Sequence, residues 1–195
     1  MVGTGHDLVI SGTRRFGHFR SMIIGSTGMK LLRHCPCPVW LTEPQSKKIQ
    51  SILVAHDLKP VGDLAMKFGC DLASALKAQL HVFHSIESPE MDTFLPGSTI
   101  SSKDIEKYRS TATQHISKQL GANGVADNAE IHLDYGPAYS SIYNMIGQKG
   151  IDLLVLGTVS RSGILGIIGN TAENLLPHVK CSILAVKPED FKSST

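Results

Sequence analysis

A glycine-rich stretch ending just before residue 170 holds the residues best suited to binding chemistry in this sequence. It contains Gly157, Gly163, Gly166 and Gly169 together with small hydroxyl side chains, and it leads directly into a segment with helical periodicity. Glycines let a backbone approach a ligand closely, and the free N–H groups and dipole of a helix N-terminus attract anions. The pattern predicts a phosphate-binding loop, with a flexible loop and an ordinary helix N-cap as the alternative.

The stretch has neither of the common phosphate-binding fingerprints. No Gly-Lys-Ser or Gly-Lys-Thr follows the glycines, as a P-loop requires, and the spacing is not that of G-x-G-x-x-G. Asn170 and Thr171 come next and can cap the helix or contact a phosphate oxygen. The loop alone therefore indicates an anion and leaves the rest of the ligand open.

Few other residues suggest metal binding or catalysis. His81 and His84 lie three apart in a predicted strand and so point to opposite faces, which is poor geometry for a shared metal ion. Cys35 and Cys37 suggest redox chemistry, but the aligned segment of the repeat described below keeps only Cys181, which favours buried structural thiols. No set of nucleophile, base and orienting group is visible, so we expect no catalytic residue and no metal site.

The elements that would position these residues alternate between strand and helix. Short apolar runs predict strands, and apolar residues that recur every three or four positions predict helices. The predicted strands are 52–55, 80–86, 129–134, 153–156 and 182–186, and the predicted helices run through 61–76, 105–120, 139–146 and 170–179. This order predicts an α/β fold with an open, parallel, five-stranded, Rossmann-like sheet and helices on both faces.

Parallel sheets of this kind bind ligands beyond the carboxyl ends of their strands, where the strand order reverses. Asp57 follows the first predicted strand, Gly136 follows the third, and the glycine-rich stretch follows the fourth. We therefore expect the ligand at that end of the sheet.

The beginning of the chain repeats part of its end. Residues 7–13 (Asp-Leu-Val-Ile-Ser-Gly-Thr) resemble residues 152–158 (Asp-Leu-Leu-Val-Leu-Gly-Thr), and further matches continue at a nearly constant offset. We interpret residues 1–44 as the C-terminal strand–helix–strand of a first domain and residues 45–195 as a complete second domain. A fragment of a longer tandem protein, a misplaced start, and a short natural protein with an orphan unit are the three alternatives.

The composition excludes several other classes of protein. Of 195 residues, 42% are hydrophobic and 18% are charged, which is typical of a globular rather than a disordered chain. No apolar run is long enough for a membrane span, and residues 1–20 have no signal-peptide pattern. The net charge of +2 does not favour nucleic acid, and four cysteines without a C-x-x-C pair suit a reducing cytoplasm.

Four segments together resemble the universal stress protein family. They are Val54–Asp57, Leu133–Pro137, Asp152–Thr158 and Gly169–Glu173. The resemblance covers residues 49–188 and extends over the repeat at the start of the chain, as in the tandem, E-type members of the family. It implies a Rossmann-like fold related to the adenine nucleotide alpha-hydrolases.

The resemblance also implies a site for ATP or a related adenine nucleotide, with Mg²⁺ accompanying ATP. In nucleotide-binding members, a G-x2-G-x9-G-[S/T] loop holds the phosphates and ribose, and an aspartate at the end of the first strand lies on the adenine side. Carried over to this chain, the implied nucleotide-binding residues are Ala55, Asp57, Ser85, Leu156, Gly157, Val159, Ser160, Gly169, Asn170 and Thr171.

The loop departs from the family motif in both copies. In the complete copy, a serine (Ser160) replaces the second glycine, the spacing is one residue shorter, and Asn170 replaces serine. In the partial copy, Arg15 replaces that glycine and could either crowd a phosphate or pair with it, but the strands for an adenine pocket are absent. A Cβ at Ser160 could crowd the phosphate path in the same way.

Two functions remain after these departures. The first is a stress-response sensor or regulator that binds an adenine nucleotide, with any hydrolysis slow and incidental; the second is an interaction or scaffold protein with a degenerate pocket. Because fifth strands pair across a two-fold axis in the family, the resemblance also implies that residues 39–41 pair with residues 183–186, which leaves residues 8–10 as an apolar sheet edge. Such an edge predicts a homodimer or higher oligomer, with other protein partners left unidentified.

Overall fold

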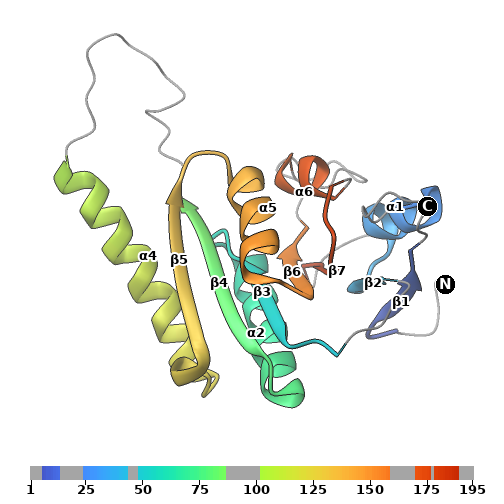
Figure 1. The fold of residues 1–195 in the computed structure, drawn as a ribbon, viewed down its shortest axis with the longest axis horizontal. Coiled ribbons are helices and arrows are strands. Elements are labelled where there is room, and N and C mark those ends of the chain that lie inside the picture. The colour runs from blue at the N-terminus through green and yellow to red at the C-terminus, as the bar shows by residue number, and fades with distance from the viewer. Residues whose placement is uncertain are drawn as a thin grey trace, which may run out of the picture.

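A computed structural model describes residues 6–13, 24–43, 48–86, 102–158, 170–176 and 178–188. The strands are β1 (Val9–Gly12), β2 (Val39–Thr42), β3 (Ser51–Ala55), β4 (Gln79–Ile86), β5 (Ala129–Tyr135), β6 (Leu153–Gly157) and β7 (Ser182–Val186). The helices are α1 (Ser26–His34), α2 (Pro60–Leu76), α4 (Ser102–Ala122), α5 (Ala138–Lys149) and α6 (Asn170–Leu175), with a 3₁₀ turn at Ala126–Asn128. The strands form one sheet in the order β1-β2-β7-β6-β3-β4-β5 (Figure 1).

The parallel five-stranded sheet predicted from the sequence is confirmed by the strands from β3 to β7. β3 pairs with β4 on one side and with β6 on the other, so the strand order reverses between β3 and β6. In this register Ala55, at the end of β3, lies opposite both Phe83 in β4 and Leu156 in β6. The reversal point is where a ligand is expected in such a sheet.

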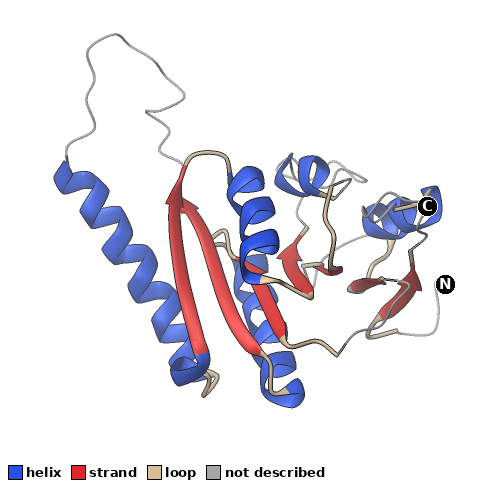
Figure 2. Ribbon diagram, in the orientation of Figure 1, coloured by secondary structure: helices blue, strands red, loops and turns tan. Residues whose placement is uncertain are grey.

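Helices cover both faces of the sheet (Figure 2), and alternating strand residues supply the two cores. On one face, Met66 of α2 and Ile116 of α4 pack in a cluster with Leu153 and Val155 of β6. On the other face, the neighbouring residues of β6 pack with α1, α5 and α6; this cluster includes Leu154, Leu156, Leu32, Ile142 and Leu175. Because β6 is buried on both sides, it reads as a continuous apolar run in the sequence.

The predicted pairing of residues 39–41 with residues 183–186 is present in the structure. β2 runs antiparallel to β7, with Val39 opposite Ala185 and Leu41 opposite Ile183. β1 pairs in parallel with β2 and has no second neighbour among the described strands. Ile10 in β1 is 63% exposed.

Two helices end at positions that differ from the sequence prediction. α5 extends to Lys149 and ends at Gly150, whose φ of 62° is the left-handed conformation common after a helix. α6 ends at Leu175 instead of continuing to residue 179. The sequence has Pro177 just beyond, and helices usually end at or before the residue preceding a proline. Among the described helices, none combines the length and apolar character that a membrane span needs.

Gly69 allows α2 to lie close to β3, and its replacement should destabilise the fold. A Cβ at this position would overlap Cγ2 of Val54, a buried and conformationally stiff side chain. We expect Gly69→Ala to lower the free energy of unfolding by about 1–3 kcal/mol, as measured by urea denaturation. Gly121→Ala in α4 is the control, because a Cβ there meets no atom within 4 Å and should stabilise by up to about 1 kcal/mol. Equal stability of the two variants would contradict the close packing.

Candidate functional site

Five of the sequence-predicted residues lie at or just beyond the carboxyl ends of β4, β3 and β6: Ser85, Ala55, Asp57, Leu156 and Gly157. Ala55 and Leu156 are cross-strand partners at the reversal point and pack in one apolar cluster. Asp57 follows β3 and is exposed, with its Oδ1 accepting a hydrogen bond from the Lys59 N–H at 3.1 Å. The carboxylate therefore stabilises the turn into α2, and it is exposed just beyond the carboxyl end of β3, where the ligand is expected.

Ser85, near the end of β4, connects the ends of β4 and β5 through a hydrogen bond. Its hydroxyl donates to the carbonyl of Gly136 in the turn after β5. Gly136 has a φ of 102°, a conformation that side chains other than glycine rarely adopt. The hydroxyl implied to lie beside adenine is thus also part of the local fold.

Gly157, at the end of β6, has a packing role. A Cβ at this position would lie 2.7 Å from Cγ1 of Val61, in the first turn of α2. The sequence suggested close approach to a phosphate, whereas the described contact is close approach of a helix. Thr158 continues the chain as a buried residue whose N–H and hydroxyl both donate to the carbonyl of Val186, at 2.9 and 3.2 Å.

The remaining predicted residues belong to the loop and the following helix. Val159, Ser160 and Gly169 lie outside the described residues. Asn170 begins α6, and Thr171 is half-buried in its first turn. The structure therefore shows where Ala55, Asp57, Ser85, Leu156 and Gly157 and the start of α6 lie, and the nucleotide-binding role of these residues and of the loop remains a prediction.

A histidine network beside this site was not predicted from the sequence. The side chain of His56 is fully buried between β3 and the helices, and its Nε2 lies 3.1 Å from Gln119 Oε1 and 3.3 Å from Asp63 Oδ1. His115 Nε2 is 3.0 Å from the same Asp63 oxygen. Asp63 and Gln119 come from α2 and α4, so the network ties both helices to the end of β3.

The backbone selects the form of the His56 ring. The N–H of Leu58 donates to His56 Nδ1 at 2.8 Å, so the ring proton lies on Nε2, where it donates into the network. Leu58 itself has a φ of 57°, a left-handed conformation that is costly for a branched side chain. Burial lowers the pKa of His56 below its usual 6.5, which favours the neutral ring. Although burial acts to raise it, hydrogen bonds from His115 and Gln119 hold the pKa of Asp63 below its usual value.

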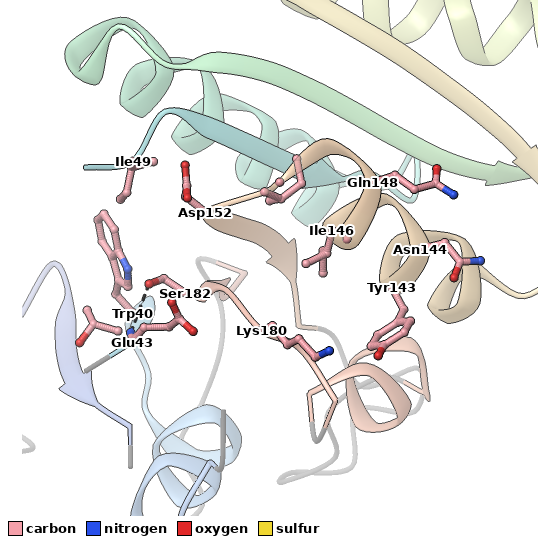
Figure 3. A pocket seen from close by; sticks show the side chains of 14 residues that line it. Trp40, Glu43, Ile49, Tyr143, Asn144, Ile146, Gln148, Asp152, Lys180 and Ser182 are labelled. Atoms are coloured by element: carbon pink, nitrogen blue, oxygen red, sulfur yellow. Dashed lines mark hydrogen bonds between the residues drawn. The ribbon is translucent and has the colours of Figure 1, made fainter. Parts of the chain in front are cut away.

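A separate pocket of about 560 Å³ lies at the opposite end of the sheet (Figure 3). Trp40 and Ser182 line one side, and Tyr143 and Asn144 of α5 line the other. Asp152 stands between them and uses its Oδ2 to accept the N–H groups of residues 50 and 51. None of the implied nucleotide-binding residues that the structure describes lines this pocket.

Comparison with known proteins decides the family. The model of the Universal stress protein family matches residues 3–43 and 48–187. The chain belongs to the universal stress protein family. Proteins named Universal stress protein E are among the relatives: the one from Photorhabdus laumondii subsp. laumondii is 26% identical over 96% of this chain and 63% of its own length. Universal stress protein E of Escherichia coli K12 is 25% identical over 99% of this chain and 64% of its own length.

Solved universal stress proteins share the fold. A universal stress protein from Pseudomonas aeruginosa UCBPP-PA14 is 26% identical, with a TM-score of 0.71 over 94% of this chain and 64% of that one. Another universal stress protein, crystallised in complex with cAMP, is 19% identical, with a TM-score of 0.54 over 72% of this chain and 98% of that one. The chain spans less than two-thirds of the length of the E-type relatives.

The buried His56 should make stability depend on pH. Because its pKa is lowered in the folded state, the unfolded chain binds more protons below about pH 6.5, and stability is lost as the pH falls through that value. Replacing His56 with Asn keeps an acceptor for the Leu58 N–H and removes the titration, so the thermal midpoint should fall less steeply between about pH 7.5 and 5.5. His178→Asn, at an exposed position, is the control. A His56→Asn slope equal to that of the parent would refute this role.

Proposed function

We propose that this chain binds an adenine nucleotide at the carboxyl ends of β4, β3 and β6. The observation that carries the proposal is the placement of Ser85, Asp57 and Leu156 at the ends of three adjacent strands, across the point where strand order reverses. A family member in complex with cAMP supports this class of ligand. In a stress protein, such binding would serve as a sensor or regulator.

The donor set on the described side of the site fits an adenine nucleoside. The carboxylate of Asp57 is exposed two residues after half-buried Ala55, which pairs with Leu156 of the next strand. An exposed carboxylate at this point offers an acceptor for the amino or hydroxyl groups of a nucleoside. ATP with Mg²⁺ would place its charge toward residues 157–171, whose glycines and hydroxyls suit phosphate oxygens.

A specific observation favours the alternative of an interaction or scaffold protein. The space above Gly157 is filled by Val61, and the Ser85 hydroxyl already donates to Gly136. Two of the groups implied to contact a nucleotide therefore already make contacts within the fold.

Mass spectrometry of the supernatant from the denatured, freshly purified protein would detect a retained nucleotide directly.

Asp57→Asn separates the two functions. The amide oxygen can still accept the Lys59 N–H, so the turn is kept while the charge is lost. A hydrogen bond to a charged group contributes about 1.5–3 kcal/mol, so calorimetry with ATP and Mg²⁺ should show binding at least about 10-fold weaker. Asp71→Asn, at an exposed position of α2, should bind as the parent does. No heat from the parent at millimolar ATP would favour the scaffold function, and equal binding by Asp57→Asn would contradict a nucleotide site at Asp57.

We further propose that residues 1–44 and 45–195 belong to two successive domains of the family. The antiparallel pairing of β2 with β7 joins the two segments through their equivalent last strands, as expected if each is the end of one unit. The repeat of residues 7–13 in residues 152–158 supports the same division.

The edge strand β1 should make this chain self-associate. Leu8 and Ile10 are 37% and 63% exposed, and an unpaired apolar edge is a template for another strand. We expect light scattering at micromolar concentration to show a dimer or larger species, and Ile10→Lys to shift it toward monomer. Tyr108→Lys, at another exposed apolar residue on α4, should leave the assembly unchanged. A monomeric parent would refute the proposal.

A further inference from the structure

Three side chains with metal-binding chemistry meet on the β4–β5 pair, away from the strand ends discussed above. His81 of β4 lies directly opposite Glu130 of β5 in the parallel register. His132 is two residues further along β5 and therefore points to the same face of the sheet. Lys149, the last residue of α5, also reaches this face, with its Nζ 3.0 Å from Glu130 Oε2.

The distances among the three side chains match those of a metal centre. His81 Nδ1 is 3.2 Å from His132 Nε2 and 3.5 Å from Glu130 Oε2, and His132 Nε2 is 3.6 Å from the same oxygen. Bonds of about 2.0–2.1 Å in tetrahedral geometry require ligand atoms about 3.3–3.4 Å apart. We propose that His81, Glu130 and His132 bind a zinc-like divalent transition metal and leave its fourth position open.

The protonation of the cluster supports this assignment. Burial lowers the pKa of both His81 and His132, which favours the neutral ring that can ligate a metal. A hydrogen bond from Lys149 holds the pKa of Glu130 below its usual value, so its carboxylate is charged. His81 Nδ1 and His132 Nε2 face each other. Without a cation, a proton on one of these nitrogens can form a hydrogen bond to the other; with a cation bound, both nitrogens would be ligands.

Lys149 has a second role when a cation is present. A dication at the three ligand atoms would repel the ammonium group from Glu130 Oε2. Both groups are half-exposed, so the lysine can move to solvent or to the other carboxylate oxygen. When bound to the other carboxylate oxygen, Lys149 would orient the ligating carboxylate, as neighbouring groups do around many protein-bound metals.

The second histidine cluster in the described part of the chain provides a contrast. His56, Asp63 and His115 also bring their polar atoms close together. However, the Leu58 N–H occupies His56 Nδ1, so the proton must lie on Nε2, the atom that faces the other two side chains. A metal on Nε2 would require the ring proton to move to Nδ1, which would break the hydrogen bond from Leu58, whereas His81 Nδ1 faces only another ring nitrogen, His132 Nε2. This cluster is therefore the matched control.

The ligand types define the ions that should bind. Two imidazoles and a carboxylate suit Zn²⁺, Co²⁺, Ni²⁺ or Cu²⁺, whereas Mg²⁺ prefers oxygen ligands. The ion would join β4 to β5, which is the last strand at that end of the described sheet. Its binding would stabilise the folded state in proportion to the logarithm of metal concentration.

The test is calorimetric titration of Zn²⁺ into the tag-free, chelator-treated full chain, with Mg²⁺ titrated in parallel. We expect one Zn²⁺ per chain, a higher thermal midpoint, visible absorption typical of tetrahedral Co²⁺, and no response to Mg²⁺. His132→Gln should weaken Zn²⁺ binding by about 100-fold or more, and Glu130→Gln should also weaken it. His115→Gln, in the control cluster, should leave it unchanged.

Two further measurements keep the result unambiguous. The metal-free thermal midpoints of His132→Gln and Glu130→Gln show that the variants fold, and either variant alone suffices if the other does not. Cys37→Ser tests the neighbouring thiols of Cys35 and Cys37, whose sulfur atoms are 3.5 Å apart. Absence of Zn²⁺ binding, unchanged binding in a folded His132→Gln, or loss of binding in Cys37→Ser would overturn the proposal.

Discussion

The close packing of α2 across β3 and β6 is the constraint on which the candidate site depends. At Gly69 the helix lies against Val54 of β3, and at Val61 it lies against Gly157 of β6. A third glycine, Gly62, leaves room for the side chains of His56 and Asp57 at the start of the helix. Larger residues at these points would push the helix off the sheet and move the turn that carries the Asp57 carboxylate. These glycines are therefore needed for the packing of α2 on the sheet, whether or not a ligand binds.

Apolar periodicity is sufficient to predict most of this architecture. β6 is apolar at nearly every position because it is buried on both faces, and the apolar stripe that begins with Val61, Leu64 and Ala65 predicts α2. The pairing of β2 with β7 was also predictable, because the repeat identifies them as equivalent strands. Helix ends were harder: the end of α6 depends on Pro177 more than on its apolar pattern.

The polar networks could not be predicted in the same way. His81 and His84 are neighbours in sequence, but the partner of His81 is His132 on the adjacent strand. Finding that pair requires the β4–β5 register, and a shift of one residue would send His132 to the other face. His56 is a similar case, because its partners on α2 and α4 meet only when both helices pack on one face. The packing of Gly157 could not be predicted for the same reason, since only the fold shows that Val61 lies where a Cβ of residue 157 would be.

Amide shift mapping by NMR during an ATP titration tests the central claim most directly, because it locates the ligand. The claim predicts that the largest shifts fall on Asp57, Lys59, Gly157 and Thr158, at the carboxyl ends of β3 and β6. The indole of Trp40, the single tryptophan of the chain, lines the pocket at the other end of the sheet, and its NMR signal should not shift. Shifts centred on Trp40 and Lys180, or no shifts at saturating ATP, would contradict it.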